Sequence, residues 1–179
     1  MARAPEGFGR STSAAAEAVS RDLRLGDDGW LRRRRRVGAL SLSAMGSMGV
    51  VTAYQMGLIR RPPEPRVWPL DAEKVDASGE AYQFLRTPDA ALGLASYAVT
   101  LVLAGAGDRH RARTAPWVPL ALAAKVGLDA VSGMLLTAEQ ASKHRRYCSW
   151  CLAASLASLA MVPQVLPEAR EAWRRLRRD

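Results

Sequence analysis

The stretch that decides the fold is Lys143-His144-Arg145-Arg146-Tyr147-Cys148-Ser149-Trp150-Cys151, which runs directly into an apolar segment. Cys148 and Cys151 are the only cysteines of the 179 residues. Their Cys-x-x-Cys spacing suits one helical turn, so both sulfurs can meet at the first turn of a helix. Free backbone N–H groups and the helix dipole stabilise a thiolate there. The basic residues before the pair favour the thiolate in the same way.

Four segments of the chain are apolar enough to form membrane-spanning helices. The first, residues 37–59, has 23 residues without a charge, and a helix needs roughly 20 to cross a bilayer. The other three are residues 90–107, 115–138 and 148–166. We therefore expect an all-α fold, an integral membrane four-helix bundle over residues 37–168 that is surrounded by lipid.

The segments outside the spans are polar. Residues 1–36 are expected to form a mobile cytoplasmic tail, although residues 13–25 also have the charge spacing of a short helix. Residues 169–179 form a basic C-terminal tail. In the first connector, Asp76 is expected to cap a short amphipathic helix that continues through Leu85.

The distribution of basic residues predicts the orientation. The arginine run 32–36, the second connector and the C-terminal tail carry 13 arginines, whereas the first and third connectors carry 8 basic residues. The positive-inside rule then places both termini in the cytoplasm and the cysteine pair at the outer face of the cell membrane. Disulfide chemistry is favoured on that side. The net charge of +9 is therefore interpreted as membrane topology and not as nucleic-acid binding.

The third span contains two charges, Lys125 and Asp129, which are four residues apart. This spacing lets them pair on one face of a helix. Charges at membrane depth are costly unless they pair or face the interior of the bundle. Two interpretations stay open: the pair contributes to a functional site, or it is a neutralising structural pair between helices.

The four-span order and the sequence around the cysteines resemble the vitamin K epoxide reductase family. Tyr147-Cys148-Ser149-Trp150-Cys151 resembles the active-site turn of that family, and residues 88–97 (PDAALGLASY) resemble its second helix. The chain looks like a divergent bacterial-type member. The resemblance implies a membrane bundle in which a dithiol reduces a quinone. Electrons would come from a thioredoxin-like partner or a secreted dithiol protein.

The resemblance also implies roles for single residues. Cys151 would contact the quinone, Cys148 would exchange with the partner, and Asp89 would hydrogen-bond a quinone oxygen. Ser155 stands where some members have a quinone-contacting tyrosine. Trp150 can line a flat-ring pocket or belong to the aromatic belt at the membrane interface. The quinone is expected near Asp89 and the Lys125/Asp129 pair.

This chain departs from the family pattern because residues 60–87 contain no cysteine, so the internal electron shuttle of the family is missing. The cysteine pair itself has two simpler interpretations, a static disulfide or half of a metal site. The leading hypothesis is a membrane thiol–disulfide oxidoreductase that passes electrons to a quinone. The alternative is a non-catalytic membrane bundle that binds a quinone, a lipid or another protein.

Overall fold

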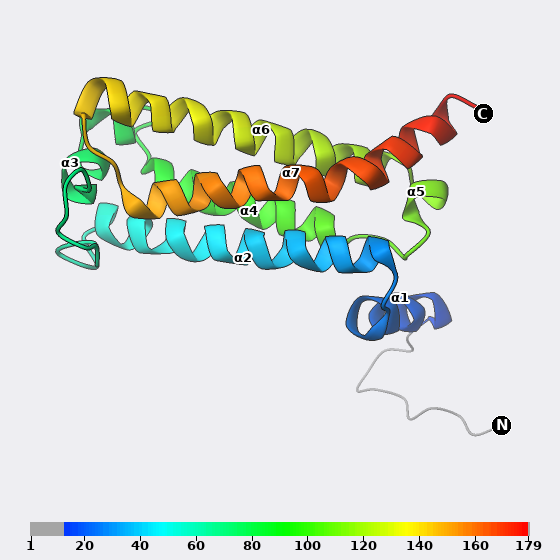
Figure 1. Cartoon of the computed structure of the whole chain (residues 1–179). Helices are drawn as coiled ribbons and strands as arrows, with labels where there is room; N and C mark the ends of the chain where they lie inside the picture. Colours follow the sequence, from blue (N-terminus) through cyan, green and yellow to red (C-terminus); the bar gives the residue numbers. More distant parts are fainter. Residues whose placement is uncertain (1–12, 179) are drawn as a thin grey trace.

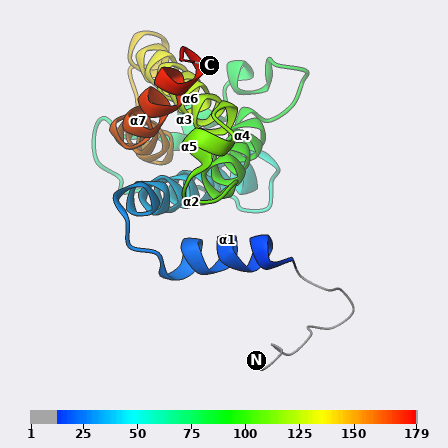
Figure 2. The same ribbon diagram turned by 90° about the vertical axis from the view of Figure 1, so that its right-hand side faces the viewer.

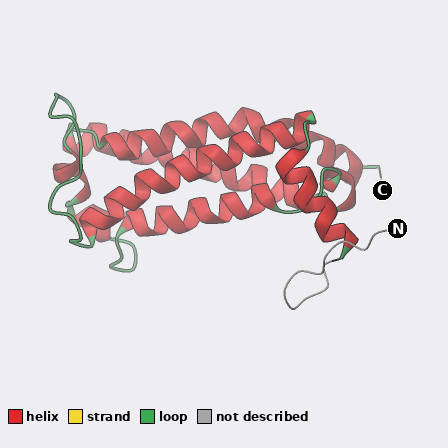
Figure 3. Cartoon of the chain, turned by 90° about the horizontal axis from the view of Figure 1, so that it is seen from below, coloured by secondary structure: helices red, strands yellow, loops and turns green. Residues whose placement is uncertain are grey.

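Four long helices lie side by side in an elongated bundle in the computed structural model, which describes residues 13–178 (Figure 1). They are α2 (Gly29–Gln55), α4 (Asp89–Gly105), α6 (Trp117–Glu139) and α7 (Ser149–Leu176). Three helical segments, α2, α7 and α6 with its continuation to His144, are long and apolar enough to cross a membrane, and α4 is a shorter apolar helix. Loops gather at the two ends of the bundle (Figure 3). The predicted all-α membrane bundle is confirmed.

Two of the long helices extend beyond the apolar segments that predicted them. α2 begins at Gly29 because the Asp28 side chain accepts a hydrogen bond of 2.8 Å from the Leu31 N–H. The arginine run 32–36 is therefore helical. α7 continues to Leu176 through two internal prolines. Basic sequence at a helix end thus prolongs the helix instead of ending it.

The N-terminal region contains one further helix, α1 (Ala14–Leu25), which begins at the Ser13 cap. It lies outside the bundle and crosswise to α2 (Figure 2). The short helix considered for residues 13–25 is therefore present. The remainder of the expected tail, residues 1–12, lies outside the described residues.

The first connector folds differently from the prediction. It forms α3 (Ala72–Asp76) and a 3-10 turn, η1 (Gly79–Tyr82), at the end of the bundle where α7 begins (Figure 1). The cap of α3 is Asp71, whose side chain accepts from the Lys74 N–H at 3.1 Å. Leu85 and Arg86 both have a positive φ, which ends any helix there. The expectation that Asp76 caps a helix through Leu85 was therefore wrong.

Small residues let the helices approach closely beside the cysteine end. A Cβ on Gly133 of α6 would lie 2.9 Å from the hydroxyl oxygen of Ser155 on α7. A Cβ on Gly93 of α4 would lie 3.1 Å from the sulfur of Met48 on α2. Such close contacts replace the hydrophobic driving force that is missing between helices in lipid. The buried hydrophobic core of the bundle includes Met48 and its neighbour Val51 on α2.

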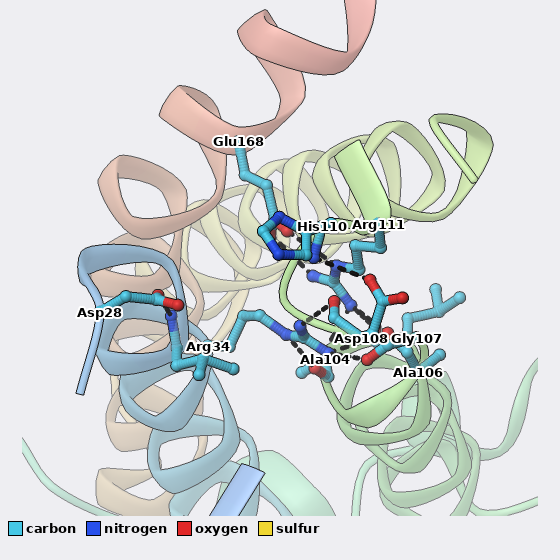
Figure 4. Close-up of polar contacts among 11 residues, drawn as sticks. Asp28, Arg34, Ala104, Ala106, Gly107, Asp108, His110, Arg111 and Glu168 are labelled. Atoms are coloured by element: carbon cyan, nitrogen blue, oxygen red, sulfur yellow. Dashed lines mark hydrogen bonds and ion pairs between the residues drawn. The ribbon is translucent and has the colours of Figure 1, made fainter. Parts of the chain in front are cut away.

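At the opposite end, two buried arginines hold the C-terminus of α4 (Figure 4). Arg34 of α2 donates to the carbonyl groups of residues 104, 106, 107 and 108 at 2.8–3.0 Å. Arg111 of α5 (Arg111–Thr114) donates to the carbonyls of residues 103 and 106, and it pairs with Glu168 of α7 through two hydrogen bonds of 2.8 Å. These contacts satisfy carbonyl groups that a helix end leaves unpaired.

Candidate active site

The two cysteine sulfurs meet at the first turn of α7. Cys148 is the N-cap of this helix, and its Sγ accepts a hydrogen bond of 3.2 Å from the Cys151 N–H. Both cysteines are free thiols. Their Sγ atoms and one carboxylate oxygen of Asp76 all lie within 4.8 Å of one another. The pair is therefore close enough to exchange between dithiol and disulfide.

The two thiols differ in their access to the surroundings. Cys148 is 0% exposed, and its backbone N–H donates to Gln140 Oε1 at 3.1 Å. Cys151 is only partly buried, and it lines a cavity between the helices. A small molecule in the cavity can therefore reach Cys151, whereas Cys148 lies behind it.

The first connector attaches to the chain directly before α7. The Asp71 N–H donates to the Tyr147 carbonyl at 2.9 Å, and the Tyr147 N–H donates to the Pro69 carbonyl at 3.0 Å. The Glu64 carboxylate accepts from the Ser149 N–H at 2.6 Å. The connector is thus fixed by backbone hydrogen bonds at Tyr147 and by the Glu64 side chain at Ser149, on both sides of Cys148, and this thiol is buried.

The cavity has a volume of about 240 Å³ and is bounded by α2, α3, α4, α6 and α7. Four of the residues predicted from the sequence line it: Cys151, Asp89, Asp129 and Ser155. Its apolar wall includes Met48, Val51, Val75, Ala90, Leu128 and Leu136. An apolar cavity with a few convergent polar groups is typical of a small-molecule site.

Asp76 is the residue that the sequence did not identify as part of the site. It is 4% exposed, and its Oδ1 accepts a hydrogen bond of 3.5 Å from the Cys151 thiol. Its Oδ2 is buried and has no hydrogen-bond partner among the described residues. Burial raises the pKa of this carboxyl group from 3.8 to about 6. No local sequence pattern links it to Cys151, which is 75 residues away.

The basic cluster before the cysteines does not contact the sulfurs in the way that the sequence predicted. Lys143 pairs with Glu139, and Arg146 lies 3.9 Å from Asp71. The charged side chain that reaches Cys151 is instead the acid Asp76. Asp76 is therefore an acidic contact beside Cys151 that the sequence did not predict.

Lys125 and Asp129 form a polar network between α6 and α4. The Lys125 ammonium contacts both carboxylate oxygens of Asp129 at 2.5 and 2.7 Å, and it donates to the Ser96 hydroxyl at 2.8 Å. Thr100 donates to the other side of Asp129 at 2.9 Å. Asp129 lines the cavity, and Lys125 is not among the lining residues. The lysine therefore neutralises the charge of Asp129 without lining the cavity itself.

Asp89 lies at the start of α4 and is held by α2. Its Oδ1 accepts from Gln55 Nε2 at 2.7 Å, while Gln55 Oε1 accepts from the Ala90 N–H at 3.2 Å. On the opposite wall, the Ser155 hydroxyl donates to the Gly133 carbonyl at 3.3 Å. Both side chains therefore have fixed positions at the cavity.

Trp150, like Lys125, is a predicted site residue that does not line the cavity. It packs against the hydrophobic core, and its indole N–H is buried without a hydrogen-bond partner among the described residues. Instead of Trp150, the lining aromatic residue is Tyr97 of α4, whose hydroxyl lies 2.9 Å from the Ser158 hydroxyl. The sequence does not identify Tyr97 as a lining residue, because its orientation depends on how α4 packs against α7.

A metal site at the cysteines would have few ligands. Among residues 13–178, the two sulfurs and Asp76 form a group of three donor side chains, and His144 is outside it although it lines the cavity. Structural zinc sites use four protein ligands. The geometry therefore favours a dithiol over half of a structural metal site.

Comparison with known proteins identifies the family. The model of the vitamin K epoxide reductase family matches residues 36–166, which include all four long apolar segments and both cysteines. Neither the curated proteins nor the solved structures give a match. The family match covers most of the chain and agrees with the resemblance of the cysteine turn. The chain therefore belongs to the vitamin K epoxide reductase family.

Proposed function

We propose that this protein is a membrane thiol–disulfide oxidoreductase that passes electrons from a dithiol through Cys148 and Cys151 to a quinone. Family membership and the apolar helices support a membrane thiol oxidoreductase in general. The observation that carries the finer proposal is the position of Cys151. Its side chain lines an apolar cavity, and Cys148 lies directly behind it.

The reaction has two halves. In the first, the Cys148 and Cys151 thiols lose two electrons and two protons and form one S–S bond, and the quinone gains both to become a hydroquinone. In the second, a donor dithiol reduces the new disulfide by thiol–disulfide exchange and becomes a disulfide itself. Both halves use the same cysteine pair.

The cavity offers suitable contacts for a quinone. Its aliphatic wall suits a flat ring, and the Ser155 hydroxyl, whose proton is donated to the Gly133 carbonyl, can accept from a hydroquinone hydroxyl. The Asp89 carboxylate can accept from a hydroquinone hydroxyl. Lys125 acts indirectly, by keeping Asp129 neutralised at the cavity wall. Trp150, which lies between the two cysteines in the sequence, packs against the hydrophobic core.

The donor must reach a buried thiol. Exchange at Cys148 requires the first connector to move, because Cys148 is 0% exposed. We infer that a thioredoxin-like or secreted dithiol protein displaces this connector and forms a mixed disulfide with Cys148, which Cys151 then resolves. An external donor is needed because residues 60–87 have no cysteine.

The charge distribution supports an orientation with both termini in the cytoplasm and the cysteine pair at the outer face. Arg34 and Arg111 are among the basic residues in that count, yet both side chains are buried against the end of α4. The predicted orientation therefore rests on the exposed arginines at the same end of the bundle.

The test is quinone reduction by the protein purified in detergent and supplied with a dithiol. Cys148→Ser and Cys151→Ser should both abolish turnover, and Ser149→Ala, in the same helical turn, should leave it unchanged. Full activity of Cys151→Ser would exclude the mechanism.

One observation favours the non-catalytic alternative, a bundle that binds a quinone, a lipid or another protein. Cys148 is fully buried beneath a connector that has no cysteine of its own. Thiol trapping in intact cells separates the two functions. A pair that changes between reduced and oxidised forms supports the enzyme, and a pair locked in one form supports the binding protein.

A further inference from the structure

Asp76 and Cys151 come from different parts of the chain, and their side chains touch beside the cavity. The Cys151 thiol donates to Asp76 Oδ1 at 3.5 Å, and both residues line the cavity. We propose that Asp76 is a catalytic residue, the base that accepts the Cys151 proton and transfers it toward the quinone. This inference rests on the proposed function, because it assigns the proton path of the same reaction.

The surroundings of Asp76 do not provide a structural reason for a buried acid. In the described part of the chain, no salt bridge includes Asp76. Its Oδ2 has no hydrogen-bond partner there. A buried polar atom without a partner costs free energy of folding, roughly 1–3 kcal/mol in proteins. Such a cost is typical of a group that is retained for chemistry.

Several elements pack around Asp76, and most of the groups that they contribute are acidic or neutral. These titratable groups are Cys148 and Cys151 at the start of α7, Asp89 of α4, Glu64 of the connector, Tyr54 of α2, Glu80 and Tyr82 of η1, and Lys143 and His144 of η2 (Gln140–His144), the π-helical turn that follows α6. Lys143 pairs with Glu139. Burial, with Asp89 and Glu64 adding to it, raises the pKa of Asp76 to about 6. At neutral pH the group is thus ionised but close to its titration, as a general base should be.

The proton balance of the first half-reaction then has a route. Asp76 takes the Cys151 proton, and the sulfur electrons become available for bond formation with Cys148. The proton moves from the Asp76 carboxyl group into the cavity, toward a quinone oxygen. The Cys148 proton follows over the same carboxylate, since this sulfur also lies within 4.8 Å of it. Two protons and two electrons pass from the cysteines to the quinone, which becomes a hydroquinone as the S–S bond forms, and Asp76 ends as the carboxylate with which it began.

The test is the single-turnover reaction of the reduced protein with a soluble short-chain quinone, followed by absorbance between pH 5 and pH 8. In the wild type the rate should rise with pH through about 6, because the carboxylate is the active form. Asp76→Asn should lower the maximal rate by about 100-fold or more and remove this rise, since general-base catalysis contributes about 10²–10⁴-fold. The quinone concentration that gives half of the maximal single-turnover rate should change little. Asp76→Glu should recover part of the rate together with the pH dependence.

The matched control is Glu73→Gln, which removes an exposed acid from the same short helix and should behave as the wild type. An Asp76→Asn protein with the rate and pH profile of the wild type would overturn the inference. An Asp76→Glu protein that is as slow as Asp76→Asn and independent of pH would overturn it as well. A wild type that reduces no quinone at any pH would instead overturn the proposed function itself.

Discussion

The Glu64 carboxylate lies 2.6 Å from the Ser149 backbone nitrogen, which is the first N–H after Cys148. The other oxygen of the same carboxylate accepts from the Ala72 N–H, also at 2.6 Å. One acid therefore joins the start of α3 to the start of α7. Because each of these N–H groups belongs to the free end of a helix, the negative charge is favourable at both. Glu64 closes the connector over Cys148.

Glu64→Ala should expose Cys148. The substitution removes two charge-assisted hydrogen bonds, each of which contributes roughly 1.5–3 kcal/mol. The reduced variant should therefore react with a bulky maleimide at Cys148 at least about 10-fold faster than the wild type, by the usual conversion of free energy into populations. Mass spectrometry of the labelled peptide distinguishes Cys148 from Cys151.

The control for this experiment is Glu80→Ala, which removes another acid of the same connector that makes no such hydrogen bond to α7. Labelling of Cys148 should stay slow in this protein. Equal labelling rates in wild type and Glu64→Ala would mean that other contacts hold the connector closed.

Asp76 should make the protein less stable at neutral pH than at mildly acidic pH. Its pKa of about 6 in the folded protein lies above the ordinary pKa of 3.8 for an aspartate, so the folded state binds this proton more tightly than the unfolded state. The stabilisation is complete below pH 4 and is lost as the pH rises to about 6, with a total of about 2 to 3 kcal/mol. Asp76→Asn should remove this slope and raise the Tm at pH 7.

Thermal unfolding in detergent between pH 4 and pH 8 measures this effect. Glu73→Gln is again the matched control and should retain the slope of the wild type. A lower Tm of Asp76→Asn at pH 7 would show that the charge of Asp76 stabilises the fold, which contradicts the prediction.

Lys125 and Asp129 should be coupled in their effect on stability. Each is largely buried, with 17% and 7% of its side chain exposed. Lys125→Met leaves a buried carboxylate without its partner, and Asp129→Leu leaves a buried ammonium, so each should cost roughly 3–5 kcal/mol. The double variant should cost less than either single change. Denaturation in detergent for the four proteins gives the coupling free energy, and additive effects would exclude a structural pair.

Arg111 should be required for stability but not for the chemistry. It is 0% exposed, pairs with Glu168 and caps the carbonyl groups at the end of α4 (Figure 4). Arg111→Met should lower stability by several kcal/mol, because a buried carboxylate and several carbonyls lose their donor. Arg113→Met, an exposed position on the same short helix, should have little effect. A change in kcat in a folded Arg111→Met protein would contradict this division.

The sequence determined the features that depend on local composition. Long uncharged segments can only be accommodated as helices in a membrane, and this was enough to predict the all-α bundle. The Cys-x-x-Cys spacing predicted that the sulfurs meet in one helical turn. Asp129 was identified by its charge within an apolar span, whereas Asp89 and Ser155 were expected at the site because of the resemblance to the vitamin K epoxide reductase family.

The tertiary structure decided which of these side chains face one cavity. Asp76 reaches Cys151 across 75 residues because α3 folds over the start of α7, and the sequence predicted only a cap there. Trp150 packs against the hydrophobic core, and Lys125 pairs with Asp129 without lining the cavity itself. Arg34 was bound by the end of α4 rather than by solvent. Composition and periodicity report the environment along a helix, but the contacts between helices depend on how several elements pack together.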